Sequence, residues 1–228
     1  EYFKHDHTDQ FWFPPQGGYP DAYEQRVIPD PSTTQAQLIS GDLDQLYFNV
    51  LNVDRVLANE LKSRGLQVQE GQANTNCTLV MNMESFPDLR QRQAIMKAID
   101  YDGFIQSVYL GDGELGAPVG NGYPDSVRLP KEQLKSYLTR NVAEAKRLWD
   151  SAGGGNRQLT MLSIANFPFM EQATGFCKQS LEQALGVSVK LDSIDIPSWI
   201  ARAQQTPTKD WDFLVQFSQS TPDVPTFN

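Results

Sequence analysis

The sequence predicts an α/β fold, because short apolar runs with an alternating pattern take turns with longer segments of helical periodicity. Glycine and proline separate these segments along most of the chain. Hydrophobic residues make up 39% and charged residues 21% of the 228 residues, which is typical of a folded protein with a sizeable core. The length permits one large domain or two small ones.

The first predicted unit is a β-α-β unit, which follows loop-like residues 1–21, rich in aromatic residues, proline and glycine. It contains a strand over 23–28, a helix capped by Asp30 or Ser32, and a strand over 42–46. Aspartate and serine are favoured at this position because a side-chain oxygen accepts a hydrogen bond from the first turn of the helix.

Another helix is predicted to begin at Asn52 or Asp54, with Val56 on its apolar face. Alternating apolar residues then predict two strands, one around 66–68 and one around 78–80.

Three helices are predicted in the middle of the chain. The first opens at Asp88 and places Leu89 on its apolar stripe, and the second is short and capped by Asp102. The third runs over 131–152 with a break near Asn141.

The C-terminal part alternates regularly between strands and helices. The predicted order is a strand over 159–165, a helix over 168–185, a strand over 187–191, a helix over 197–204 and a strand over 211–217.

The acidic composition excludes some classes of partner. With a formal net charge of −9, the chain lacks the clustered Lys and Arg that contacts with nucleic acid or an anionic membrane require. No stretch approaches the roughly 20 apolar residues of a membrane span. The first residues include neither an initiator Met nor a signal peptide, so we expect a processed or partial chain whose missing leader says nothing of its compartment.

One motif has the letters of a dinucleotide-binding loop, Gly111-Asp-Gly113-Glu-Leu-Gly116. A dinucleotide site needs this motif after a strand and before a helix, so that the phosphates meet the helix amides. Here it follows a predicted helix and leads into a loop, which indicates a helix end with turns. No cofactor is therefore expected.

Catalytic and metal sites are not expected either. Both histidines, His5 and His7, lie with Asp9 in the N-terminal loop, where an adventitious metal contact is the most they suggest. Cys77 and Cys177 do not form a CxxC motif, and whether they pair as a disulfide stays open. With no credible constellation of catalytic residues, the sequence does not predict an enzyme.

Several stretches together resemble one family, in the order in which its members carry them. The stretch from Arg26 to Asp44 is similar to a strand, "IPD" turn, helix and "sGxxD" strand, and Phe86 to Asp100 is similar to the "PFxDxrvRqAixxAiDR" helix. The helix from Ala143 to Gly153 resembles "AkxLLxeAG". The family is the family 5 extracellular solute-binding proteins of ABC transporters, of the dipeptide/oligopeptide-binding type.

The resemblance implies a fold like that of type II periplasmic binding proteins. It implies that residues 1–70 are the C-terminal part of lobe I with the hinge crossing, including its β-α-β piece. Residues 71–228 are then most of lobe II, a mixed sheet with flanking helices.

The resemblance also implies a function. Members capture a peptide or another small solute between two lobes, outside the cytoplasm, in the periplasm or as cell-surface lipoproteins, and deliver it to ABC permease subunits. The alternative is a ligand-sensing module of the same fold that signals to a regulator. Ser220 stands where peptide-binding members carry the aspartate that grips the α-ammonium of the ligand, and a neutral hydroxyl cannot form that ion pair.

Placement on the family pattern gives the ligand-binding candidates. They are Tyr47 and Phe48 after the "sGxxD" strand, Asn76, Cys77 and Thr78 at the first strand of lobe II, and Phe217, Ser218, Gln219 and Ser220 after the last strand. Phe48 and Phe217 have an alternative role as core residues, because aromatic side chains dominate protein cores.

Overall fold

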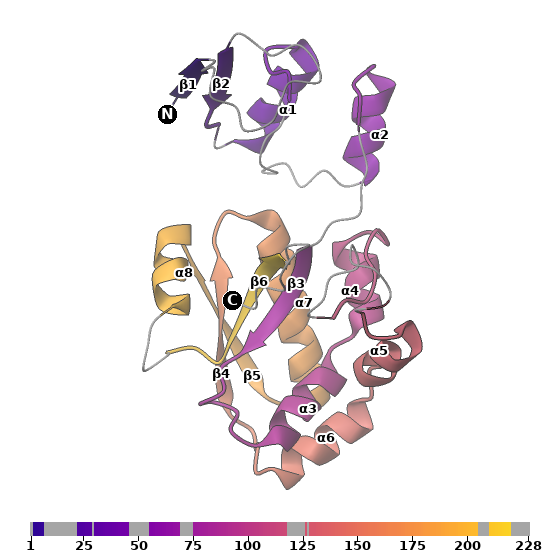
Figure 1. Cartoon of the computed structure of the whole chain (residues 1–228). Helices are drawn as coiled ribbons and strands as arrows, with labels where there is room; N and C mark the ends of the chain where they lie inside the picture. Colours follow the sequence, from indigo (N-terminus) through magenta and orange to yellow (C-terminus); the bar gives the residue numbers. More distant parts are fainter. Residues whose placement is uncertain are drawn as a thin grey trace. The chain divides into compact units, whose positions relative to one another are not determined.

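The computed structural model divides the chain into two units, Glu1–Val68 and Gln69–Asn228 (Figure 1). It describes residues 2–6, 22–28, 30–45, 55–68, 75–117, 126, 128–204 and 210–219.

In the first unit, strand β1 (Tyr2–Asp6) pairs antiparallel with strand β2 (Ala22–Arg26), and helix α1 (Pro31–Ser40) follows. The prediction of a loop over 1–21 is therefore wrong for β1. Asp30 caps α1 as predicted, with its Oδ1 accepting a hydrogen bond from the backbone N–H of Thr33 at 2.7 Å.

The strand predicted over 42–46 is wrong for residues 42–45, which are in neither a strand nor a helix. Gly41 ends α1 with φ of +82°, and the backbone N–H groups of Asp42 and Leu43 both donate to the carbonyl of Gln37. Because these N–H groups close the end of the helix, they are not free to pair in a sheet. The described part of the first unit therefore lacks the second strand of the predicted β-α-β unit.

Helix α2 (Arg55–Ser63) buries Ala58 and Leu61 but leaves Val56 70% exposed, against the prediction for Val56. The strand predicted around 66–68 is also wrong, because these residues are in neither a strand nor a helix. The backbone N–H of Leu66 donates to the carbonyl of Leu61, which continues the closure of α2.

The second unit is built on a four-stranded mixed sheet with the order β3-β6-β4-β5. The strands are β3 (Thr75–Met81), β4 (Gln158–Ile164), β5 (Ser188–Ile194) and β6 (Phe213–Gln219). β4 is parallel to β5 and β6, whereas β3 is antiparallel to β6.

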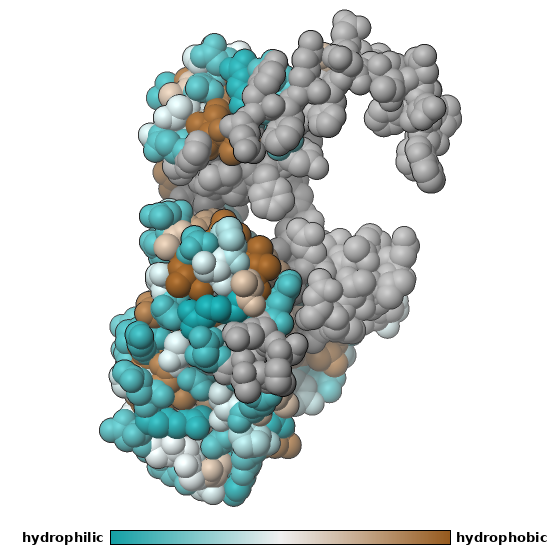
Figure 2. Space-filling view, turned by 90° about the vertical axis from the view of Figure 1, so that its left-hand side faces the viewer, coloured by the Kyte–Doolittle hydropathy of each residue, from teal (hydrophilic) through white to brown (hydrophobic). Residues whose placement is uncertain are grey.

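Helices cover both faces of this sheet (Figure 1). The main core lies between one face and the helices α3 (Leu89–Ala98), α4 (Tyr101–Val108), α6 (Val142–Ser151) and α7 (Pro168–Leu185). A smaller core lies on the other face, where Leu162 and Leu214 meet Trp199 of helix α8 (Ile196–Ala203). Figure 2 looks from the side that carries α8 and shows hydrophilic and hydrophobic residues interspersed.

The helix starts show which local predictions hold. The predicted break near Asn141 is confirmed, because helix α5 (Lys131–Leu138) ends before it and Asn141 caps α6. The cap of α4 is Asp100, whose Oδ1 accepts from the N–H of Gly103 at 3.0 Å, so the prediction of Asp102 is wrong. Leu89 is 58% exposed because it lies in the first turn of α3, outside the stripe that faces the core.

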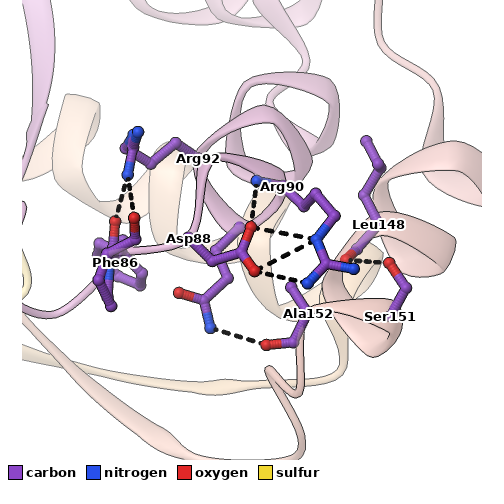
Figure 3. Close-up of polar contacts among 9 residues, drawn as sticks. Phe86, Asp88, Arg90, Arg92, Leu148, Ser151 and Ala152 are labelled. Carbon is purple, nitrogen blue, oxygen red and sulfur yellow. Dashed lines mark hydrogen bonds and ion pairs between the residues drawn. The ribbon is translucent and has the colours of Figure 1, made fainter.

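Charged side chains fasten the start of α3 (Figure 3). Asp88 accepts hydrogen bonds from the backbone and the guanidinium of Arg90, which lowers the pKa of its carboxyl to about 2. Arg92 donates to the carbonyl of Phe86 at 2.7 Å, and Gln91 donates to that of Ala152 at 3.3 Å. The stretch from Phe86 to Asp100, which resembles a helix pattern of the family, therefore anchors the loop after β3 to the end of α6.

None of the helices in the described part of the chain is both long and apolar enough to cross a membrane.

Candidate functional site

The strand directions bring distant residues together at one edge of the sheet. The carboxyl ends of β4, β5 and β6 share that edge, because these strands are parallel. The amino end of β3 lies there too, since β3 is antiparallel to β6. Asn76 pairs with Ser218 and Cys77 pairs with Phe217. Sheet pairing therefore unites the middle and C-terminal groups of predicted site residues.

Phe217 is 41% exposed at this edge and is not a core residue. Its ring centroid lies 5.1 Å from that of Phe169 and 6.4 Å from that of Phe167. Phe169 is buried and contacts the ring of Tyr109 at 5.2 Å. We call Phe167, Phe169, Phe217 and Tyr109 the aromatic floor. One ring of the floor is thus open to a ligand and supported by others beneath it.

Cys77 lies beside this floor, and its thiol is protonated and unreactive. Burial raises the pKa of its thiol to about 12, although a hydrogen bond with the Tyr109 side chain acts in the opposite direction. Burial also raises the pKa of the Tyr109 hydroxyl. Both groups are therefore neutral at physiological pH, and Cys77 is not a thiolate nucleophile.

Cys177 of α7 is buried, and burial raises the pKa of its thiol as well. Both cysteines are free, so the disulfide left open by the sequence is not formed.

Asn76 contacts the protein itself. Its Nδ2 donates a hydrogen bond to the backbone carbonyl of Ala117 at 3.0 Å. Thr78 pairs with Gln216, and its side chain points to the opposite face of the sheet from Cys77, since successive strand residues alternate. Among the three residues predicted on β3, only Cys77 therefore faces the side of the floor.

The remaining candidates are described in part or not at all. The backbone of Ser218 and Gln219 belongs to β6, but their side chains lie outside the described residues, as do Tyr47, Phe48 and Ser220.

No group of His, Cys, Asp and Glu in the described part of the chain could hold a metal ion. His7 and Asp9 lie outside it, and of His5 only the backbone in β1 is described. The motif at 111–116 follows α4, and residues 112–117 are in neither a strand nor a helix, which confirms that it is a helix end with turns. Gly111 has φ of +85°, a conformation that glycine adopts without strain.

The sequence analysis missed Phe167, Phe169 and Tyr109. A signal was present, because Phe167-Pro168-Phe169 comes two residues after the end of β4, and aromatic residues near the carboxyl end of a strand are candidates for ligand contact. The role of Tyr109 could not be seen, since only the tertiary structure brings α4 to β3 and α7.

The family model described as bacterial extracellular solute-binding proteins, family 5 middle, matches residues 1–228. The chain belongs to this family. The resemblance found in the sequence is thereby confirmed, together with its mixed α/β fold of the type II periplasmic binding proteins. Proteins of family 5 are components of transport rather than enzymes.

Similar proteins with curated sequences or solved structures agree with this family assignment. The oligopeptide-binding protein AppA of Bacillus subtilis is 26% identical over 208 residues, which are 86% of this chain and 37% of the relative. The PBP AgaA from Agrobacterium tumefaciens R10, solved with agropinic acid, is 25% identical with a TM-score of 0.70 over 88% of this chain and 39% of AgaA. AppA of Bacillus subtilis, solved with a nonapeptide, has a TM-score of 0.69 at 22% identity over 95% of this chain and 44% of AppA. The chain thus spans less than half the length of these family 5 relatives.

Proposed function

We propose that the complete protein is the extracytoplasmic solute-binding component of an ABC importer, and that the edge with Phe217 forms part of its solute site. The single observation that supports this most is the position of Phe217. It is 41% exposed at the carboxyl edge of the sheet, although the buried ring of Phe169 supports it. Ligand sites are typically apolar surfaces with a few placed polar groups, often at the carboxyl ends of strands.

The solute we propose is a peptide or another small molecule that presents an uncharged, apolar group to the aromatic floor. The floor offers aromatic faces beside the neutral thiol of Cys77, whose pKa is about 12, and no charge of its own. AppA was solved with a nonapeptide and AgaA with agropinic acid, so both classes of solute belong in the search. Ser220 favours solutes without a free α-ammonium, because its hydroxyl carries no charge.

The wider setting of this proposal follows from the family. We propose that residues 1–70 belong to lobe I and the hinge crossing and that 71–228 form most of lobe II. The partners would be the permease subunits of the importer, the compartment would be the periplasm or the cell surface, and no catalysis would take place.

A thermal-shift screen of the complete protein tests the proposal. The panel contains N-acetyl-Phe-Ala-amide, trialanine, maltotriose, agropinic acid and a nickel–histidine complex. A compound that binds only the folded state raises the midpoint temperature of unfolding. At a concentration of 100 times its Kd, it stabilises the folded state by about 2.7 kcal/mol. We expect a shift with at least one uncharged or blocked compound, and a panel without any shift would contradict the proposed function.

Two variants then test the site. F217A is expected to weaken binding of the active compound about 10- to 100-fold, as the loss of an aromatic anchor does. M83A is the matched control, because Met83 is 58% exposed in the turn at the opposite end of β3. Equal affinities of F217A and M83A would show that the solute does not contact the aromatic floor.

A further inference from the structure

We propose that Glu171 is a positioning residue of the solute site, which holds the turn between β4 and α7 and with it the ring of Phe167. This inference rests on the proposed function and assigns to Glu171 a role that acts through Phe167 rather than by contact with the solute. Glu171 lies in the first turn of α7, and its side chain and its backbone contact two consecutive residues of the turn.

Two hydrogen bonds of Glu171 enclose the residues of this turn. Its Oε1 accepts from the backbone N–H of Asn166 at 3.1 Å, and its own backbone N–H donates to the carbonyl of Phe167 at 3.1 Å. Just before them, the backbone N–H of Ala165 donates to the carbonyl of Ile194 at 2.9 Å, which ties the start of the turn to the end of β5. Because the groups bonded to Glu171 lie before Asn166 and after Phe167, the backbone dihedral angles of both residues are restrained.

The conformation of the turn makes this restraint important. Asn166 has φ of +59°, in the left-handed region that is less stable for residues other than glycine, although asparagine tolerates it better than most. In the described part of the chain, Leu110 is the other non-glycine residue with a positive φ, at +52°, and it directly follows Tyr109. Both positions adjoin rings of the aromatic floor, and uncommon backbone conformations of this kind cluster at ligand sites.

The ring of Phe167 depends on the turn more than the ring of Phe169 does. Phe169 lies within the first turn of α7 and belongs to the main core, so the helix and the core fix it. Phe167 precedes the helix as its N-cap residue, with an extended backbone, and it is only half-buried. Its ring centroid lies 6.4 Å from that of Phe217, near the upper limit of about 7 Å for an aromatic contact. A small change in the turn would therefore separate these rings and reshape the floor around Phe217.

Glu171 also has a purely structural role, because a carboxylate in the first turn of a helix interacts favourably with the helix dipole. Two variants separate the roles. E171Q removes the charge but keeps an oxygen that can accept from Asn166, whereas E171A removes both. The dipole alone predicts that E171Q behaves like E171A, while the positioning role predicts that E171Q keeps the affinity of wild type.

The test is a double-mutant cycle of the complete protein, with E171A, F167A and E171A/F167A, in titration calorimetry with N-acetyl-Phe-Ala-amide. We expect E171A to weaken binding about 3- to 10-fold, as the loss of one hydrogen bond does. F167A should weaken binding about tenfold or more, because it removes a ring of the floor. Since Glu171 acts through Phe167, the double variant should bind as F167A does, and E171Q should bind as wild type does.

E182A is the matched control. Glu182 lies near the other end of α7, and its Oε1 accepts from the backbone N–H of Val189 at 2.9 Å, so the same kind of contact is lost far from the floor. This variant should lower stability but leave the affinity of the folded protein unchanged. Unchanged affinity in E171A, an E171Q protein that binds as weakly as E171A, or additive losses in the double variant would each overturn the proposal.

Hydrogen exchange of the Asn166 amide, measured without solute, distinguishes this failure from a failure of the proposed function. The amide should exchange faster in E171A than in wild type and E171Q, because it has lost its acceptor. Equal rates in E171A and wild type would refute the positioning role of Glu171. A wild-type protein that binds nothing in the thermal-shift panel would instead refute the proposed function, and the exchange rates would still decide whether Glu171 holds the turn.

Discussion

Replacement of Gly154 by alanine is expected to destabilise the second unit markedly. A Cβ atom at this position would lie 2.3 Å from Cε2 of Trp149, whose side chain is fully buried. The indole cannot retreat, because its Nε1 donates to the carbonyl of Gly155 at 2.9 Å and its ring packs against Phe86. The guanidinium of Arg157 lies over the same indole, 5.3 Å from the centroid.

The magnitude follows from the cost of overpacking a filled core, which is about 1–3 kcal/mol or more when the surroundings cannot move. For a domain of about 150–250 residues, each kcal/mol of lost stability lowers the midpoint temperature of thermal unfolding by about 2–4 °C. The matched control is G175A. Gly175 lies inside α7, and a Cβ there would meet no atom within 4 Å. This variant should stabilise the protein by about 0.5–1 kcal/mol, because alanine is the better helix former.

The assay is urea denaturation of wild type, G154A and G175A, followed by circular dichroism at equal protein concentration. A change in midpoint at constant slope reports a change in stability. Opposite shifts of the two variants are expected. A G154A protein as stable as wild type would show that the indole of Trp149 can move, and the argument from close packing would fail.

Three further predictions concern single side chains. N82A should cost about 1–3 kcal/mol in urea denaturation, because the buried carbonyl of Trp211 loses its hydrogen bond, and an unchanged midpoint would refute this. Burial raises the pKa of Cys77 to about 12, so the folded protein favours the neutral thiol. The stability that this preference contributes is complete below the unfolded pKa of 9.0 and is lost as pH rises from 9.0 towards 12. A thiol reagent should label Cys77 at neutral pH only after denaturation, and rapid labelling of the native protein would contradict the burial. Arg90 lowers the pKa of Asp88 to about 2, so the stability that the ionised carboxyl contributes is present above pH 3.8 and is lost as pH falls towards 2. In D88N, which can still cap α3, the free energy of unfolding should fall less between pH 3.8 and pH 2 than in wild type. An equal fall in both proteins would argue against the Arg90 contact.

The sequence predicted best those elements whose first and last residues are marked by local signals such as proline, glycine or a capping side chain. Helix α7 begins with Pro168 and ends at Gly186, which has φ of +71°, and the prediction matched both ends. The break at Asn141 was predicted for the same reason, since Asn141 caps α6 through a contact three residues away. Local chemistry is sufficient where a cap and its partner lie within one turn.

The errors arose where two local solutions compete. Asp42 and Leu43 carry a strand-like pattern, but their N–H groups are used to close α1. Asp100 and Asp102 are both plausible caps, and Asp100 also accepts an ion pair from Arg140 at 3.2 Å, across 40 positions of sequence. Only the tertiary structure decides between such alternatives.

The candidate site depends on register more than on composition. Cys77 faces Phe217 because β3 and β6 pair antiparallel in one register, although 140 positions separate the two residues. A slip of β6 by one residue would turn Phe217 away from Phe169, since side chains alternate along a strand. The buried residues of β6 prevent this slip, because Phe213 and Val215 fill the main core while Leu214 fills the smaller one. The cores on both faces of the sheet thus fix the position of Phe217 in the aromatic floor. Placement on the family pattern could name Phe217 itself, but not the rings that support it, because the tertiary structure brings these rings from other elements.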